Sequence, residues 1–319
     1  MSPEVPAIQA GSPLTGRLCI VLAAVLWSTS GLFTKAPLFD DWPLEERGVL
    51  LAFWRALFAG LCVLPLVRRP RWDWKLLPMV GCFAGMSIAY MTSVTLNTAA
   101  NAIWLQSTAP LWVLLYTVLI WRGGVRREDV STLIFCALGL GLILYYEFSE
   151  GSGAGAPAQS RWGVLCGLAA GACYGGVIVS LHALRAHHAV WLVVINQLTT
   201  AAVLAPWALS LGRWPSGWQL ATLAAFGALQ IAVPYLLFTR GLRSVPSQEA
   251  SLLGLLEPVL VPFWVLFALG NQETRWWTVA GGGLILLGLA FRYLPGTRTG
   301  ARAGNLHSAS ASAPKSSGP

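Results

Sequence analysis

The sequence predicts an all-α integral membrane protein with ten transmembrane helices in two inverted five-helix repeats. Of the 319 residues, 55% are hydrophobic and only 11% are charged, whereas soluble domains carry about 25% charged residues. The hydrophobic residues form ten blocks that are long enough to cross a bilayer as helices. Similar residues also recur in the fourth and ninth blocks, which suggests an internal repeat.

Each block is predicted to be a helix because it lacks the alternating pattern of outer-membrane strands. Arg17 is the only basic residue before the first block, and no convincing cleavage site follows the block, so we expect a retained helix. Glycine recurs at every fourth position from Gly163 to Gly175, which favours close packing on a neighbouring helix over a dimer seam. The blocks span residues 18–34, 49–67, 76–96, 99–121, 130–146, 162–181, 189–211, 218–238, 247–269 and 276–293.

Basic residues are distributed unevenly between the two ends of these helices. If the N-terminus is inside, fifteen of the 21 Lys and Arg residues lie in inner segments, five lie in outer segments, and Arg55 lies within a helix. Cytoplasmic loops are enriched in Lys and Arg, so we expect both termini in the cytoplasm and the chain in the inner or plasma membrane. The charge of +8 therefore does not call for a nucleic-acid partner.

A glycine-rich segment, GSGAGAP at 151–157, divides the ten helices into two groups of five. Aligning the fourth helix with the ninth pairs Ala102 with Ala250 and Pro110 with Pro258. Two related units with an odd number of helices must have opposite orientations, as in many transporters with a substrate site between the repeats. We expect an N-terminal cytoplasmic segment (1–17), two repeats (18–146 and 162–294), a linker (147–161) and a disordered cytoplasmic tail (295–319).

Three helices combine a proline with a polar side chain near the middle of the membrane. Proline has no N–H, so the carbonyl four residues earlier loses its helical partner. Such carbonyls should face protein or a wet cavity rather than lipid. The three sites favour a shared cavity over separate kinks; they are Pro110 with Gln106, Pro234 with Gln230, and Pro258 with Gly254 and Glu257.

Two ionisable residues, Glu257 and Arg55, are predicted within the membrane and are candidates for substrate binding or coupling. A buried carboxylate can bind a proton or a cationic group of a substrate, and a neutral structural role is the alternative. Arg55 lies about 9 Å from the outer end of its helix. It can therefore lie near Glu257 or extend to the outer interface, and the sequence leaves both alternatives open.

No catalytic or metal-binding motif accompanies these residues. The histidines near the inner end of the sixth helix (His182, His187 and His188) lack metal-site spacing, and no GxSxG sequence is present. The six cysteines lie in predicted helices without a CxxC pair, which is typical of buried thiols. We therefore expect no enzyme activity, no cofactor and no metal.

Five segments, in their order and spacing, resemble EamA-type members of the drug/metabolite transporter superfamily. They are LWSTSGLFTKA at 26–36, FWRALFAG at 53–60, TAPLW at 108–112, SLLGLLEPVLVPFW at 251–264 and GGGLILLG at 281–288. The resemblance covers about residues 16–294 and implies an inverted repeat, a central cavity, and export of amino acids, related metabolites or drugs by alternating access. Family-typical positions are held by Trp27, Lys35, Arg55, Pro110, Glu257 and Pro258.

The sequence departs from the family pattern where the fourth and ninth helices end. Family members often have a glutamate there, in a pattern like LGE. This chain has Gly123 and Gly124 in the first half, and Glu273, displaced by about two residues, in the second. A shared role of those glutamates is therefore not expected here.

We predict a secondary transporter that exports small polar or amphipathic metabolites, as a monomer or homodimer, with protons as the candidate coupling ion. A nucleotide-sugar or drug-type transporter is an alternative, although the former would require more basic residues than Arg55. A non-transporting membrane scaffold is the alternative from another class. The candidate binding or coupling residues are Glu257, Arg55, Gln106, Gln230 and Trp27, and the candidate helix-break residues are Pro110, Pro234, Gly254 and Pro258.

Overall fold

The structure, a computed structural model, describes residues 13–68, 70–121, 127–149, 158–184, 187–269 and 275–293. These residues form helices and no strand, and all ten predicted blocks are helical. Nine of the described helical segments are long and apolar enough to span a membrane, and the tenth, Trp276–Phe291, is apolar but shorter. The prediction of an all-α membrane protein is confirmed.

Several of the transmembrane helices are interrupted. The first repeat contains α1 (Pro13–Ser28), α2 (Ser30–Thr34), α3 (Leu44–Val63), α4 (Leu76–Leu96), α5 (Ala99–Gln106), α6 (Ala109–Trp121) and α7 (Arg127–Ser149). The second contains α8 (Ala158–Ala183), α9 (Ala189–Ser210), α10 (Gly217–Ala225), the π-helix η4 (Phe226–Ala232), α11 (Val233–Gly241), α12 (Ser247–Gly254), α13 (Leu256–Leu269) and α14 (Trp276–Tyr293). Helix one (α1 and α2), helix four (α5 and α6) and helix nine (α12 and α13) are thus divided. Helix eight (α10, η4 and α11) contains a π segment.

Some helices extend beyond the apolar blocks. The first begins at Pro13 rather than at residue 18, and α3 begins at Leu44 rather than at 49. Arg47, expected in an outer loop, therefore lies near the start of α3. Polar residues at a helix end can reach the interface without leaving the helix, so hydropathy underestimates helix length. The tail 295–319, linker residues 150–157, Gly123, Gly124 and Glu273 lie outside the described residues.

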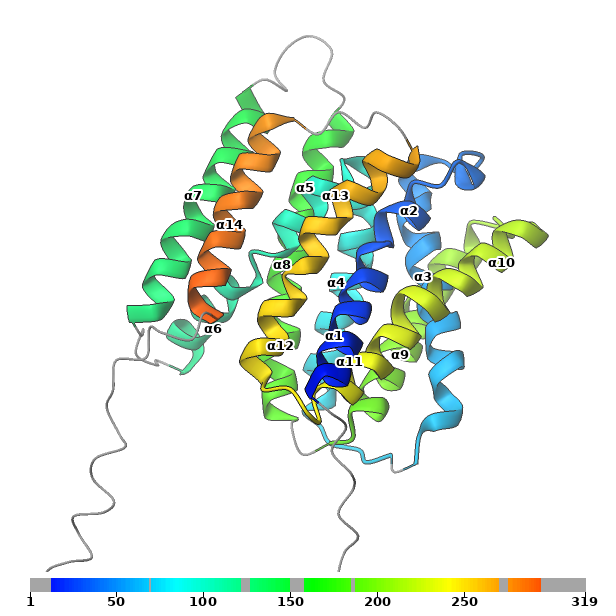
Figure 1. Cartoon of the computed structure of the whole chain (residues 1–319). Coiled ribbons are helices and arrows are strands. Elements are labelled where there is room, and N and C mark those ends of the chain that lie inside the picture. Colours follow the sequence, from blue (N-terminus) through cyan, green and yellow to red (C-terminus); the bar gives the residue numbers. More distant parts are fainter. Residues whose placement is uncertain are drawn as a thin grey trace, which may run out of the picture.

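The two repeats have opposite orientations. The first helix begins and α14 ends at the lower end of Figure 1, whereas α7 ends and α8 begins at the upper end. Each repeat has five helical passages, so the second repeat starts on the side opposite to the first. The inverted arrangement expected from the odd number of helices is therefore present.

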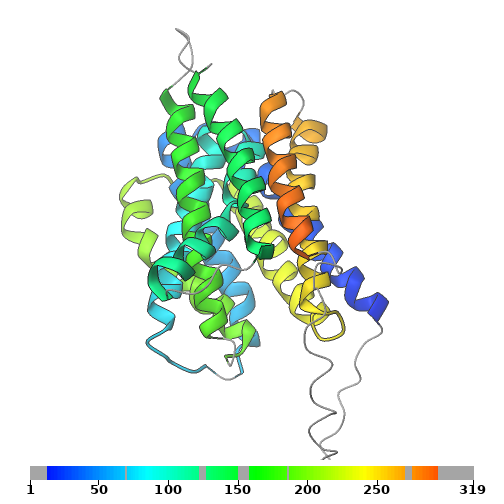
Figure 2. The same cartoon turned by 90° about the vertical axis from the view of Figure 1, so that its left-hand side faces the viewer.

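The helices of the two repeats pair as a pseudo-two-fold axis requires. Helix three (α4) packs on helix six (α8). When the repeats are exchanged, helices three and six become helices eight and one, and these also pack together, through α11 and α1. Three further pairs join a helix to its own counterpart: α3 with α9, α5 with α13, and α7 with α14. The α7–α14 pair is visible in Figures 1 and 2.

The glycines of α8 pack against helix four. A Cβ atom added at Gly171 would lie 2.7 Å from the carbonyl oxygen of Leu105, and one added at Gly175 would lie 2.9 Å from Cβ of Trp112. These distances are too short for a side chain, so glycine permits the close approach. The predicted packing role within the bundle is confirmed.

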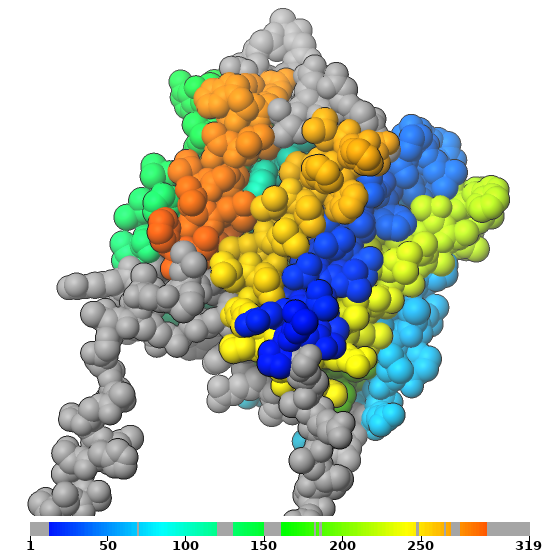
Figure 3. All heavy atoms as spheres, viewed as in Figure 1, coloured from blue at the N-terminus to red at the C-terminus, as the bar shows by residue number. Residues whose placement is uncertain are grey.

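An apolar groove of about 560 Å³ separates α13 from α14 on the face shown in Figure 3. Leu255, at the interruption of helix nine, and Val259 line one side, while α14 lines the other. Val259 and Leu287 are exposed there. An apolar surface of this kind is compatible with surrounding lipid.

Candidate functional site

Arg55 lies on α3 and its side chain is directed into the bundle, with 4% of its surface exposed. The guanidinium donates hydrogen bonds to Oε1 of Gln230 and to Oγ of Ser87, both at 3.3 Å. Its central carbon also lies 5.4 Å from the ring centroid of Phe226, within cation–π distance. No carboxylate of the described residues pairs with Arg55, and its Nε has no acceptor among them. The side chain therefore neither extends to the interface nor forms an ion pair with Glu257.

Gln230 is placed beside Arg55 by the π-helix η4. In a π-helix an N–H bonds to the carbonyl five residues earlier, as the N–H of Val233 does with Ala228. Such a local change is one way in which a transmembrane helix accommodates a proline, and Pro234 follows directly. The side-chain Nε2 of Gln230 then donates to the carbonyl of Trp27 at 3.1 Å. Gln230 thus links helix one to helix two.

Close approach of helix eight to α3 depends on Gly227. A Cβ atom added there would lie 2.7 Å from the backbone nitrogen of Ala59 and 2.8 Å from the carbonyl oxygen of Arg55. A larger residue would push the π-helix away from α3. The glycine therefore supports the contact between Gln230 and Arg55.

Helix one is interrupted at Thr29, where the hydroxyls of Ser28 and Thr29 donate to carbonyls three residues earlier, each at 2.6 Å. Hydroxyl bonds of this kind bend helices. The hydroxyl of Ser28 also accepts a hydrogen bond from the indole N–H of Trp264 at 2.8 Å. On the other side of the interruption, the hydroxyls of Ser30 and Tyr90 lie 2.9 Å apart. The residues at this break therefore contact both helix nine, through Trp264, and helix three, through Tyr90.

Trp27 precedes this interruption and is half-buried. Its ring centroid lies 5.3 Å from those of Tyr235 and Phe238 on α11. The aromatic rings form an apolar wall beside Gln230, whose amide bonds to the backbone of Trp27. This wall can contact an apolar part of a small ligand.

Helix nine is interrupted at Leu255, as the sequence around Pro258 suggested. Pro258 is buried in the first turn of α13 and cannot donate to the carbonyl of Gly254. The N–H of Leu255 instead bonds to the carbonyls of Leu252 and Leu253. The chain resumes a regular helix at α13.

Glu257 lies in the first turn of α13, where the helix dipole favours a negative charge. Its side chain is half-buried and forms no ion pair within the described residues. The hydroxyls of Tyr90 and Tyr235 are close enough to interact electrostatically with both Glu257 and Arg55. Arg55 and Glu257 therefore lie in one polar region without forming an ion pair with each other.

The two halves of the chain match the same family model separately, over residues 14–145 and 161–294. The chain belongs to the EamA-like transporter family. A protein described as an uncharacterized transporter, from Archaeoglobus fulgidus, is 31% identical over 279 residues, which cover 86% of this chain and 94% of that protein. A solved structure, described only as the crystal structure of a protein, has a TM-score of 0.60 at 19% identity and covers 88% of this chain and 98% of its own. That structure supports the fold alone.

In this EamA protein the interruption of helix four is covered by protein. The α5 helix ends at Gln106 and α6 begins at Ala109, next to Pro110. A Cβ atom added at Gly171 of α8 would lie 2.7 Å from the carbonyl oxygen of Leu105 and 3.5 Å from that of Gln106. The carbonyls near this break thus face α8.

Of the five candidate residues, three are in direct contact: Arg55, Gln230 and Trp27. Glu257 shares their electrostatic surroundings, whereas no hydrogen bond in the described part of the chain joins the side chain of Gln106 to them. The sequence did not single out the hydroxyl-bearing residues beside them, because such residues are common in transmembrane helices. These additional residues are Ser28, Ser30, Ser87, Tyr90 and Tyr235.

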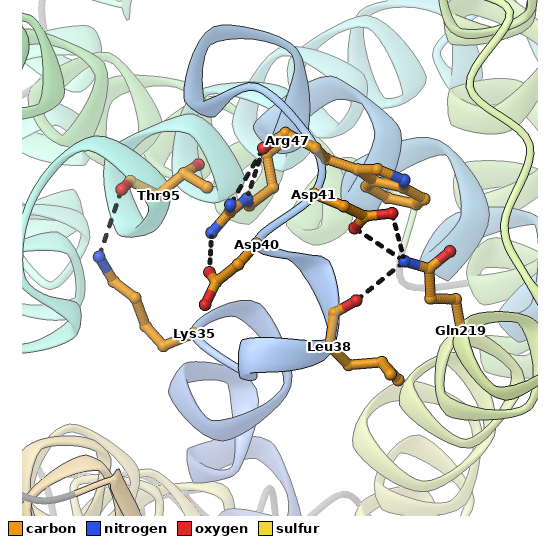
Figure 4. A network of polar contacts seen from close by, with 8 residues as sticks. Lys35, Leu38, Asp40, Asp41, Arg47, Thr95 and Gln219 are labelled. Atoms are coloured by element: carbon orange, nitrogen blue, oxygen red, sulfur yellow. Dashed lines mark hydrogen bonds and ion pairs between the residues drawn. The ribbon is translucent and has the colours of Figure 1, made fainter.

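At the upper end of Figure 1, the loop between α2 and α3 is tied to the second repeat. Nε2 of Gln219, on α10, donates to the carbonyl of Leu38 at 2.8 Å and to the carboxylate of Asp41 at 2.9 and 3.1 Å (Figure 4). Arg213 adds an ion pair with Glu46 at 3.3 Å. These contacts hold the two repeats together at this end of the EamA fold.

The same loop is also tied within the first repeat (Figure 4). Arg47 pairs with Asp40 at 3.1 Å and donates twice to the carbonyl of Trp42. Nζ of Lys35 donates to the carbonyl of Thr95 at 3.2 Å. Burial, together with the positive charge of Arg47, lowers the pKa of Lys35 to about 8, against a smaller opposing effect of Asp40.

No group of three or more His, Cys, Asp or Glu side chains in the described ranges is arranged to hold a metal ion. The central site instead combines one guanidinium, one carboxylate, an amide and several hydroxyls. These groups can bind charged and hydrogen-bonding parts of a small molecule, and the carboxylate can exchange a proton.

Proposed function

We propose that this EamA-family chain is a secondary transporter that exports small zwitterionic metabolites, such as amino acids with apolar side chains, by alternating access and without catalysis. The observation that carries the proposal is that Arg55 and Glu257 share one region without forming an ion pair. Buried charges need a partner to be stable. A substrate with a carboxylate and an ammonium group would supply a partner for each.

The surroundings of the two charges support this class of substrate. Arg55 retains an unpaired Nε, and a guanidinium binds carboxylates well through two parallel N–H groups. The rings of Trp27, Tyr235 and Phe238 offer a surface for an apolar side chain. Arg55 is the single buried cation of this site, which favours a carboxylate over the several phosphate charges of a nucleotide sugar.

The proposal includes an orientation and a coupling ion. Basic residues around the ends of α3 and α11 favour a cytoplasmic lower end in Figure 1, in the inner or plasma membrane, with both termini cytoplasmic. The ties of the α2–α3 loop to Gln219 and Arg213 support a conformation closed at the opposite, outer end. We assign proton coupling to Glu257, so that an incoming proton drives the export of substrate.

Transport by the purified chain in proteoliposomes, with an imposed pH gradient and a panel of amino acids, tests the proposal. We expect at least one zwitterionic substrate to accumulate. Arg55→Gln keeps hydrogen-bonding capacity toward Gln230 and Ser87 but removes the partner of the carboxylate. Loss of such a partner costs about 2–5 kcal/mol, so affinity should fall at least about thirtyfold. Arg240→Gln, at an exposed position of α11, is the matched control.

Two outcomes would contradict the proposal. If Arg55→Gln folds and binds the substrate as tightly as the wild type, Arg55 has no role in recognition. If the wild type transports nucleotide sugars and no amino acid, the substrate class is wrong. Absence of transport for every compound tested would instead favour a membrane scaffold.

A further inference from the structure

The middle of α9 is unusually polar for a membrane-spanning helix. Asn196, Gln197 and Thr200 lie within it, and all three are buried. Thr200 satisfies its hydroxyl by donating to the carbonyl of Asn196 at 2.7 Å. Hydrogen bonds within the helix therefore satisfy the hydroxyl of Thr200 but not all of the polar atoms of these three side chains.

Gln197 is the largest exception. Its side chain has no exposed surface, and neither its Oε1 nor its Nε2 has a hydrogen-bond partner among the described residues, while Oδ1 of Asn196 also lacks one. Buried polar groups in proteins are nearly always hydrogen-bonded, and an unpaired one destabilises the conformation that contains it. Methionine or leucine would fill a similar volume in this position without that cost. The amide is therefore expected to bind a partner in another conformation.

Contacts of the neighbouring residues place this part of α9 against helix two. Val194, one turn earlier, packs with Val63, while a Cβ atom added at Gly60 would lie 2.5 Å from Leu198. Gly60 follows Arg55 by five residues, which corresponds to about 7.5 Å of helix rise. At this depth Gln197 lies nearer than Arg55 to the end of the molecule at which α3 finishes.

We propose that Gln197 is a second substrate-binding residue, which contacts the polar end of the substrate as it passes between the central site and the lower end of Figure 1. The inference rests on the proposed transport function. An amide carries both N–H donors and carbonyl acceptors, so it can bind a carboxylate or an ammonium group. Because the amide has no charge, it binds either group weakly enough to release it.

Gln197→Met tests this inference, with Leu198→Met on the same helix as the matched control. Methionine keeps the length of glutamine and removes its hydrogen-bonding groups. We expect Gln197→Met to unfold at the same or a higher temperature than the wild type in detergent, because an unpaired amide is removed. Its transport rate should nevertheless fall at least tenfold, while Leu198→Met should transport as the wild type does.

Two results would overturn the inference. Wild-type transport by Gln197→Met would show that the substrate does not use the amide. A lower unfolding temperature, with transport reduced only in proportion to the folded protein, would show that the amide has a permanent partner such as a bound water molecule. In both cases the wild type still transports, so the proposed function would survive.

Thiol accessibility tests the inference without a transport measurement, because a residue that contacts passing substrate must meet water in one conformation. Gln197→Cys, in a chain whose six cysteines are replaced by serine or alanine, should react in liposomes with a small water-soluble maleimide. Ala170→Cys, at a fully buried position of α8, should not react. An unreactive Cys at 197 would show that the position never meets water, and would overturn the inference.

Discussion

Two buried arginines of this protein, Arg47 and Arg55, have different kinds of partner. Arg47 pairs with Asp40, and its remaining donors bond to the carbonyl of Trp42. Among the described residues, Arg55 bonds to neutral groups alone, those of Gln230 and Ser87. The first arrangement is complete within the protein and holds a loop in place. The second leaves the positive charge uncompensated, as a binding site for an anionic group requires.

Replacement of Glu257 by glutamine separates coupling from folding. Glutamine keeps the volume and hydrogen-bonding capacity of the side chain, so Glu257→Gln should fold. It cannot exchange a proton, so accumulation driven by a pH gradient should be lost. It also removes the partner of the substrate ammonium, so affinity should weaken at least about thirtyfold and counterflow should require a correspondingly higher substrate concentration. Gradient-driven transport at the wild-type rate, at equal protein level, would show that Glu257 is structural.

Lys35 makes stability depend on pH in an alkaline window. Its folded-state pKa of about 8 lies below the ordinary value of 10.5, so the protonated side chain disfavours folding below pH 8. Between about pH 8 and 10.5 the folded chain has released a proton that the unfolded chain keeps, so stability should rise with pH. In detergent, the unfolding temperature of the wild type should therefore gain about 2–4 °C relative to Lys35→Met from pH 8 to 10.

Lys75→Met, which removes a lysine at an exposed position, is the control for this measurement. If the wild type and Lys35→Met have parallel pH profiles, Lys35 keeps its proton in the folded protein. The neutral amine would still donate to the carbonyl of Thr95, so the loop should stay attached across the window.

The sequence singled out the rare residues of the candidate site but not the groups that contact them. Arg55 and Glu257 stand out because ionisable groups are costly in a membrane, and Gln230 stands out beside Pro234. Tyr90 and Ser87 carry no such signal, since their roles depend on which face of α4 meets α3. Gln106 lies four residues before a proline, as Gln230 does, yet the break in its helix is covered by α8. This spacing predicts where a helix is interrupted but not which groups lie against the interruption.

At the scale of elements, the packing of α8 on helix four makes a sharp prediction. Gly171→Ala would bring Cβ to 2.7 Å from the carbonyl oxygen of Leu105 and 2.8 Å from the hydroxyl of Thr108. Backbone cannot yield as a flexible side chain does, so we expect a loss of about 1–3 kcal/mol of stability. A lower unfolding temperature and a lower yield of folded protein in detergent would report it.

Gly81→Ala is the matched control, because nothing lies within 4 Å of a Cβ atom added at that helical glycine. Alanine favours a helix over glycine by about 1 kcal/mol, so this variant should be neutral or slightly more stable. Equal unfolding temperatures for the two variants would contradict the close packing of α8 on helix four.

The existence of the helices and the breaks beside Pro110 and Pro258 were predictable, whereas the helix ends and the other interruptions were not. A block of apolar residues that is long enough to cross the bilayer predicts a membrane-spanning helix by its length alone. The interruption at Thr29 has no proline to announce it, and Pro234 does not by itself specify a π-helix at 226–232. Polar residues such as Arg47 extend helices beyond what hydropathy detects.

At the scale of the whole molecule, the inverted repeats predict a definite topology. Reporter fusions should place both termini and the segments 68–75, 122–129 and 184–188 in the cytoplasm. The segment 151–161 should lie on the opposite side, because α7 ends at the end of the bundle opposite to the start of α1 (Figure 1). A reporter at 151–161 on the same side as one at the C-terminus would be incompatible with five passages in each repeat.

The π-helix of helix eight also makes the site sensitive to chain length. Each wide turn holds about one residue more than a regular α-helix would need for the same rise. Deletion of a single residue between Phe226 and Ala232 would replace the wide turn with a regular α-helical turn and shift the side chains within it around the helix axis. Gln230 could then no longer face Trp27 and Arg55 together. A chain one residue shorter at this point would keep every residue type of the site and lose their alignment.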